Sequence, residues 1–369
     1  MEIDPAQYDN HIEGGLYDDV VRQLMALPKG MSLGDTTYKD DFICESNINT
    51  GNFAYKCRDN GAEYETVLVG EILPRPCGTK FNVIGNHYLG TRESYRYGKL
   101  TLTCLTLPNI IDDRTRVKGV FALGKPTQAT EMMYITFGNQ IATLDDIIQS
   151  DMEELKRQNK DVNVKEWTVH AGTDQTGMPE YIPVNTEQLY VVPKGTQQTI
   201  QGKRARVAKK TINDMSELGE GKAAKKDSVA GGSRDNTQET EITTNTFYDP
   251  TVLPDYGGDL FQHINAKLHQ LDIRNVENEF IPPQDWYTSL KHGTLVMIRA
   301  TLHTFNWKEH RVYQLNGHTI RVLDASKLEI EPLSSQLNGF DTGGSPLTSN
   351  SRVSDAMANV QLGKRGRQE

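Results

Sequence analysis

The most informative segment of the chain reads KHGTLVMIRATLHTFNWKEHRVYQLNGHTIRVLD, at residues 291–324. Side chains alternate with period two from Thr294 to Trp307, which is typical of a β-strand whose two faces differ. One of these faces is almost entirely apolar and is expected to point into a core. It consists of Thr294, Val296, Ile298, Ala300 and Leu302.

A second strand is predicted from Arg311 to Leu315, and Asn316-Gly317 after it is the strongest short-range signal for a two-residue hairpin turn. Such a turn would place Leu315 opposite His318 and bring a third strand alongside, giving a three-stranded meander. The outer face of this meander would be basic and aromatic. It would hold Arg299, His303, Phe305, Trp307, Gln314 and Arg321.

Aromatic rings that stack on bases, together with cations that follow phosphates, are how proteins hold single-stranded nucleic acid without sequence preference. Residues 293–324 resemble the front half of an OB-fold, a small barrel that binds oligonucleotides. The resemblance implies that these six outer-face residues bind nucleic acid. An OB-fold needs further strands, so either strands before residue 290 complete the sheet, or the segment belongs to another small β fold.

A helix is predicted at residues 259–271, DLFQHINAKLHQL, where Asp259 would cap an apolar face of Leu260, Ile264, Leu268 and Leu271. This helix offers the alternative interpretation of the outer aromatic side chains. A helix packed on the sheet would cover them, and they would then serve packing rather than binding.

The rest of the chain predicts a mainly β fold with some α-helix (α+β), in two antiparallel domains of small-barrel or OB-like form. An N-terminal helical segment (1–40) would contain an amphipathic helix with Leu16, Val20, Leu24 and Leu27 on one face, stopped by Pro28. The first β domain (41–193) would hold strands within 65–73, 80–85, 97–108, 116–126, 132–138 and 181–195, and a polar helix at 144–158. The second would span 245–332. A shift of 195 residues aligns YGKLTLTCLTLPN with HGTLVMIRATLHT, which indicates either an internal duplication or a chance match.

Residues 194–240 carry ten Lys or Arg against six Asp or Glu and few large apolar side chains, so they are predicted to be a flexible basic linker. The densest cluster, GKRARVAKK, contains Lys203, Arg204, Arg206, Lys209 and Lys210. It has the composition of a nuclear-import signal or a phosphate-contacting arm, although solvated charge that keeps a linker extended has the same composition. Residues 333–369 are predicted to form a disordered tail.

The formal net charge is −9, and the linker's +4 leaves −13 for the remainder, so any phosphate contact must be local. Cys44, Cys57, Cys77 and Cys104 show no spacing typical of a zinc site and are expected to be free thiols. No apolar run reaches membrane-spanning length, and no secretory signal is recognised. No catalytic motif is found, and no metal or cofactor is predicted.

These observations predict a nuclear, non-enzymatic protein that binds single-stranded nucleic acid through the basic and aromatic sheet face and the basic linker. The alternative is a structural or assembly protein, a shell subunit or scaffold, whose sheets pack on copies of themselves and whose basic arms order at an interface.

Overall fold

The computed structural model describes residues 15–46, 52–89, 93–97, 100–104, 109–127, 129–160, 162–169, 181–195, 242–307 and 310–332 of the 369-residue chain. The chain divides into two compact units, one made of residues 1–89 and 109–331 and the other of residues 90–108 and 332–369. In the smaller unit, β4 (Glu93–Tyr97) and β5 (Leu100–Cys104) form an antiparallel hairpin. The predicted linker (194–240), apart from its first two residues, and the predicted tail (333–369) lie outside the described residues.

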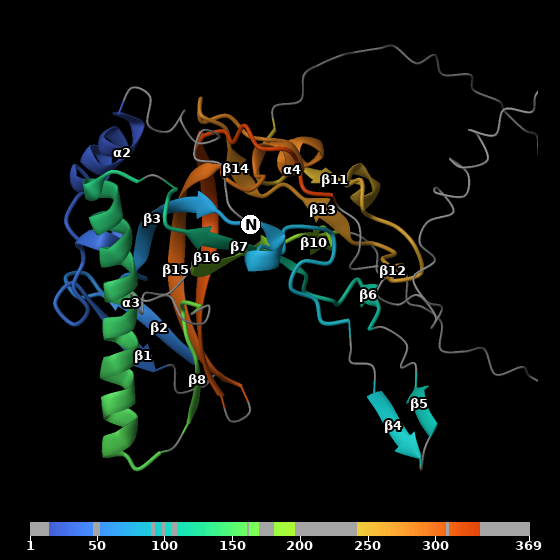
Figure 1. Cartoon of the computed structure of the whole chain (residues 1–369), viewed down its shortest axis with the longest axis horizontal. Coiled ribbons are helices and arrows are strands. Elements are labelled where there is room, and N and C mark those ends of the chain that lie inside the picture. Colours follow the sequence, from blue (N-terminus) through green and yellow to red (C-terminus); the bar gives the residue numbers. More distant parts are fainter. Residues whose placement is uncertain are drawn as a thin grey trace, which may run out of the picture. The chain divides into compact units, whose positions relative to one another are not determined.

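The larger unit is built on a nine-stranded sheet (Figure 1). Its strands in spatial order are β1 (Phe42–Ser46), β2 (Asn52–Cys57), β15 (Leu295–Trp307), β3 (Glu65–Ile72), β7 (Lys118–Gly124), β9 (Tyr181–Gln188), β16 (His310–Asp324) and β14 (Asp272–Arg274). A ninth strand, β8 (Asn163–Lys165), also pairs with β16. The predicted fold class, mostly β-sheet with a few helices, is therefore confirmed.

Five of these strands pair in a circuit. β15 and β16 form one long antiparallel hairpin, and β15 pairs on its other side with β3. β3 then pairs with β7, β7 with β9, and β9 in parallel with β16, so the pairings return to their starting point. The β3–β7 and β9–β16 ladders each join only two residue pairs. The sheet is consequently not closed into a regular barrel.

The structure differs from the expectation of two separate β domains at 41–193 and 245–332. β15 comes from the second of these segments, yet it lies between β2 and β3 of the first, and its pairing with β3 runs for seven residue pairs. A domain made only of residues 245–332 would contain β14 and the β15–β16 hairpin, and the edge of β15 that faces away from β16 would have no partner strand. Buried backbone N–H and C=O groups need hydrogen-bond partners. Strands before residue 290 supply those partners, so the two OB-like domains are not confirmed.

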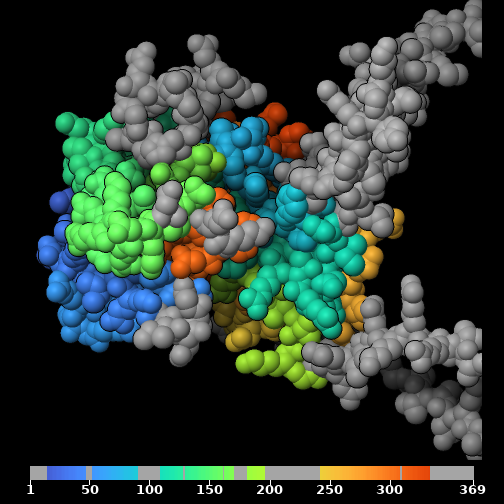
Figure 2. Space-filling model, turned by 90° about the horizontal axis from the view of Figure 1, so that it is seen from below, coloured from blue at the N-terminus to red at the C-terminus, as the bar shows by residue number. Residues whose placement is uncertain are grey.

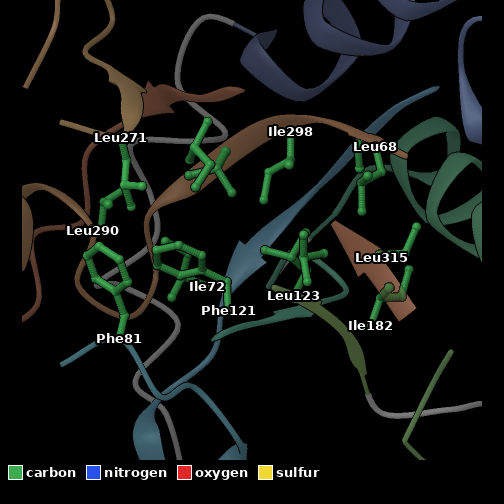
Figure 3. Packing of buried hydrophobic residues seen from close by; sticks show 14 of the residues in the cluster. Leu68, Ile72, Phe81, Phe121, Leu123, Ile182, Leu271, Leu290, Ile298 and Leu315 are labelled. Carbon is green, nitrogen blue, oxygen red and sulfur yellow. The ribbon is translucent and has the colours of Figure 1, made fainter. Parts of the chain in front are cut away.

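One hydrophobic core draws on all five strands of the circuit (Figure 3). Seven of its side chains, each at most 1% exposed, are Leu68 and Ile72 of β3, Phe121 and Leu123 of β7, Ile182 of β9, Ile298 of β15 and Leu315 of β16. The apolar face predicted for residues 294–302 is confirmed, because all five of its side chains are buried. Full burial of a large apolar side chain contributes about 1.5–3 kcal/mol, which fixes the strand's orientation.

The N-terminal helix α2 (Leu16–Met25) forms as predicted, and its face of Val20 and Leu24 is buried. This face packs against Val69 of β3 and Leu295 of β15. Leu295 belongs to the sheet face predicted to lie outside. A helix therefore does cover part of that face, but it is α2 rather than a helix at 259–271.

Helix α3 (Glu131–Arg157) is longer than the predicted helix at 144–158 and includes residues 132–138, which were expected to form a strand. The Thr130 hydroxyl caps it by accepting a hydrogen bond from the Met133 N–H at 3.4 Å. Buried side chains recur every three or four residues and define one helical face. They include Met133, Phe137, Ile141 and Leu144.

The helix predicted at 259–271 does not form. Its residues contain β12 (Phe261–Gln262) and β13 (Lys267–His269) instead. The Asp113 carboxylate accepts hydrogen bonds from the backbone N–H groups of Ile264, Asn265 and Ala266 at 2.9–3.1 Å. Because these N–H groups point at a distant carboxylate, they are not available to the i→i−4 bonds of a helix.

Several shorter elements complete the described unit, and two of them form small sheets: β6 pairs with β12, and β13 lies between β10 and β11. These elements are η3 (Leu33–Asp35), η4 (Arg75–Cys77), β6 (Ile111–Asp112), β10 (Tyr190–Val191), β11 (Phe247–Tyr248), η5 (Pro250–Val252), η6 (Pro283–Asp285) and α4 (Trp286–Ser289). Residues 80–85, predicted as a strand, contribute only an isolated bridge between Lys80 and Val120. The described thiols of Cys44 and Cys57 are free. Among the described helices, none has the length and apolar character needed to cross a membrane.

Candidate nucleic-acid interface

The β15–β16 hairpin places the six side chains predicted to bind nucleic acid on one face of the sheet. Directly opposed residues of antiparallel strands point to the same side. The register of the hairpin puts Met297 opposite Arg321, Arg299 opposite Thr319, His303 opposite Gln314, Phe305 opposite Val312 and Trp307 opposite His310.

The prediction of a two-residue turn at Asn316-Gly317 is wrong. Both residues lie inside β16, and neither has the positive φ that a type I′ turn requires. The register instead shifts between Arg299, opposite Thr319, and Ala300, opposite Gly317, which leaves one extra residue in β16 as a β-bulge. Gly317 is closely packed: a Cβ there would lie 3.0 Å from Val184 Cγ1 and 3.1 Å from Ile298 Cγ2.

The two arginines of the predicted face lie toward the end of the hairpin that is away from its turn. Both of them donate hydrogen bonds to neighbouring residues. The Arg299 guanidinium donates to Glu65 Oε2 at 3.1 Å and to the Thr319 hydroxyl at 3.1 Å. Arg321 donates to the carbonyl of Val276 at 3.2 Å. Both side chains are exposed. Arg299 has a glutamate partner, so it attracts a phosphate less than an unpaired arginine would.

The other end of the same face forms one wall of a groove with a volume of about 780 Å³. Phe305, Trp307 and Gln314, three of the six predicted residues, line it. They are joined there by side chains from β7, β9 and β16, from β8 and the residue after it, and from the segment before β7. These include Lys80, Val120, Lys165, Glu166, Tyr181, Pro183, Asn185, His310 and Val312. The structure therefore gathers half of the predicted site in a groove and places Arg299, His303 and Arg321 outside its lining.

Several aromatic rings line this groove. The Trp307 ring lies over that of His310 with centroids 6.5 Å apart, and the Trp307 side chain is 57% exposed. Phe305 is half-buried against His303, at a centroid distance of 5.8 Å. The Tyr181 side chain packs directly against Gly78. A Cβ at Gly78 would lie 2.5 Å from the tyrosine hydroxyl oxygen, so a larger residue there would clash with Tyr181. The aromatic faces that remain accessible are suited to stacking on flat rings.

The groove has a locally positive lining. Lys80 and Lys165 are exposed, and Glu166 is the single acidic side chain among its described lining residues. Lys118 lies close by, where its ammonium donates to Asn316 Oδ1 at 3.3 Å and burial lowers its pKa. Burial also lowers the pKa of His303, with the Lys118 charge adding to the effect. His303 is thereby kept in its neutral form near pH 7.

Most of this groove was missed by the sequence interpretation, which named three of its 17 lining residues. Tyr181, Pro183 and Asn185 alternate along β9 with the buried Ile182, Val184 and Thr186, so a period-two reading of 181–186 could have found their shared face. Lys80 and Lys165 come from segments with no such pattern. The five basic residues Lys203, Arg204, Arg206, Lys209 and Lys210 lie outside the described residues.

Within the described part of the chain, no group of three or more His, Cys, Asp or Glu side chains is arranged to hold a metal ion. Comparison with protein-family models, with curated proteins and with solved structures gave no match for this chain. The groove and the strand pairing are therefore the observations on which a function can be argued.

Proposed function

We propose that the chain binds single-stranded nucleic acid in the aromatic and basic groove at the turn end of the β15–β16 hairpin, where Trp307 and His310 flank the connection. The observation that carries the proposal is the meeting of Tyr181, Phe305 and Trp307 with Lys80 and Lys165 around one groove. Each stacked base contributes about 1–3 kcal/mol in proteins of this kind, and stacking is tolerant of sequence because every base has a flat face. Cations beside the rings would hold the phosphates that link the stacked bases.

The strand circuit supports the same proposal. An OB-fold is a partly open five-stranded barrel that binds oligonucleotides on the face of its second and third strands and through the loop between its fourth and fifth. In chain order the circuit is β3, β7, β9, β15 and β16, so β7 and β9 take the second and third places. Val120 of β7 and Tyr181 of β9 line the groove, as do Trp307 and His310 on either side of the β15–β16 connection. An OB-like fold would be expected to bind its ligand at this position, and this expectation supports the proposal.

The experiment is a salt series with the full-length chain and a fluorescently labelled single-stranded oligonucleotide, followed by anisotropy. Replacing Lys80 and Lys165 with glutamine should weaken binding. It should also reduce the slope of log K against log salt by about 1.4, since each phosphate contact on a single strand contributes about 0.7. Replacement of Lys29 and Lys267, exposed lysines outside the groove, removes the same charge and should leave the slope nearly unchanged.

Absence of binding by the full-length chain would refute the proposal, as would equal slopes for the two lysine pairs. The basic segment is tested separately by changing Lys203, Arg204, Arg206, Lys209 and Lys210 to glutamine. If that variant loses all binding while the groove variants lose none, the segment is the interface and the groove is not. An unlabelled duplex competitor shows whether the site prefers single strands.

A second candidate function, self-assembly, is favoured by one observation. Met132, Tyr134 and Ile135, at the start of α3, are 40–51% exposed although they are large and apolar. Apolar contacts between copies hold or strengthen as salt rises, whereas phosphate contacts weaken. Sedimentation velocity of the wild-type chain and an Ile135→Asp variant tests this candidate: a particle that dissociates in the variant supports assembly, and a monomer in both refutes it.

A further inference from the structure

A second pocket lies on the opposite face of the β15–β16 hairpin, at the same end as the groove. It has a volume of about 560 Å³, within the usual range for small-molecule sites of about 300–1,000 Å³. Figure 2 shows the orange surface of the hairpin beside the green surface around the end of α3 and the blue surface of the N-terminal strands, the three segments that line this pocket. His310 lines both the pocket and the groove. The two cavities therefore adjoin across the end of the hairpin.

The charges in this pocket balance, which argues against a phosphate as its ligand. Asp151 and Glu154 face Lys160 and Arg311. The Arg311 guanidinium is paired with Asp151 Oδ2 at 2.8 Å and lies 4.2 Å from the centre of the Phe53 ring. The walls combine flat or apolar surfaces with polar groups, and that combination suits a neutral planar ring with a hydrogen-bonding edge.

Two carboxylates of the pocket, those of Glu154 and Asp151, keep acceptor capacity beside the donors Lys160 and Arg311. Gln158 Nε2 donates to Glu154 Oε1 at 2.9 Å, and Arg157 donates to Glu154 Oε2 at 3.2 Å, so these contacts use two of about four lone-pair sites. Tyr313 and Arg311 both bond to Asp151 Oδ2 rather than Oδ1. A ligand edge that carries N–H donors would match these carboxylates, and one that presents a carbonyl oxygen would be repelled.

We infer that this pocket receives one base of the strand held in the groove and prefers bases with an exocyclic amino group over uracil and thymine. The inference rests on the proposed function, because the groove must first hold the strand. Trp307 and Phe305 would stack the preceding bases on one face of the hairpin. The next base would cross its end beside His310 and enter the pocket, where Glu154 accepts a hydrogen bond from its amino group.

Oligodeoxycytidylate and oligodeoxyuridylate of equal length provide the test, since the two pyrimidines differ at the amino group and the adjacent ring nitrogen. The full-length wild-type chain should bind the cytosine oligomer at least about five-fold more tightly, the lower end of the discrimination that one good side-chain–base pair gives. Glu154→Gln should largely abolish this preference. Glu153→Gln is the matched control: Glu153 pairs with the same Arg157 but does not line the pocket, so the preference should persist.

Equal affinity of the wild-type chain for the two oligomers would overturn the inference while leaving the proposed function intact. A preference that survives in Glu154→Gln would also overturn it. If neither oligomer binds, the proposed function fails and the inference with it. Glu154 is 52% exposed, so its replacement should not unfold the chain, and a thermal melt of both variants verifies this.

Discussion

Replacing Trp307 with alanine is expected to weaken single-strand binding while leaving the fold intact. The side chain is 57% exposed at the end of β15, so its removal opens no cavity in the core and should change the free energy of unfolding by less than about 0.5 kcal/mol. A ring that stacks on one base contributes about 1–3 kcal/mol, which corresponds to a Kd raised about 5- to 150-fold. Phe305→Ala should add a loss of the same order, although Phe305 is half-buried and its removal carries some cost in stability.

Anisotropy with a labelled single strand measures the affinity, and urea unfolding of the same samples measures the stability. Tyr134→Ala is a suitable control, because Tyr134 is also an exposed aromatic beside a cation, with Lys125 Nζ 4.7 Å from the ring centre, but it lies on α3 outside the groove. The reasoning is refuted if Trp307→Ala binds as tightly as the wild type. It is also refuted if the affinity falls only in proportion to a loss of folded protein.

Three further predictions concern the structure that supports the groove. Gly317→Ala should lower the free energy of unfolding by about 1–2 kcal/mol, because its Cβ would press on two buried β-branched side chains; a more stable variant in urea unfolding would contradict the packing role. Asp151→Asn should cost about 3 kcal/mol by leaving the buried Arg311 guanidinium without its charged partner, and pairing it with Arg311→Met should recover part of that loss in a thermal melt. Burial raises the pKa of Asp113, but the N–H groups of Ala266, Ile264 and Asn265 outweigh it and hold the pKa below the usual value. The stabilisation that ionised Asp113 gives to the folded chain should therefore be complete above about pH 4 and should be lost as the pH falls through the lowered pKa. Asp113→Asn has no carboxylate to protonate, so its acid unfolding curve should lack the loss of stability that is due to Asp113.

The faces of the long hairpin were predictable from the sequence even though its turn was not. A two-residue turn at 316–317 would reverse the chain and place odd-numbered residues before it on the same side as even-numbered residues after it. The bulge beside Gly317 has the same effect on this alternation, because one extra residue shifts the period-two pattern by one position. Tyr313, Leu315, Ile320 and Val322 are consequently all buried, as either arrangement requires.

The errors elsewhere come from partners that are distant in the sequence. Residues 259–271 have helical spacing of apolar side chains, but the Asp113 carboxylate, about 150 residues earlier, takes the backbone N–H groups that a helix would need. Residues 132–138 contain β-branched and aromatic side chains typical of a strand, but buried contacts with the sheet select the helix that continues to Arg157. In both segments tertiary contacts outweigh a local preference that is worth only a few tenths of a kcal/mol per residue.

Most of the groove could not be predicted, for a related reason. Alternation along one strand reveals which side chains share a face, but it does not reveal which strand lies beside it. β9 and β16 pair in parallel across more than a hundred residues, and the pairing joins only Leu315 with Val184 and Asn316 with Asn185. That short contact brings Tyr181 to the groove that Trp307 lines. An interface assembled this way depends on the strand circuit as a whole, so a fragment such as residues 245–335 would lack Tyr181, Lys80 and Lys165, and its failure to bind would say nothing about the groove of the full-length chain.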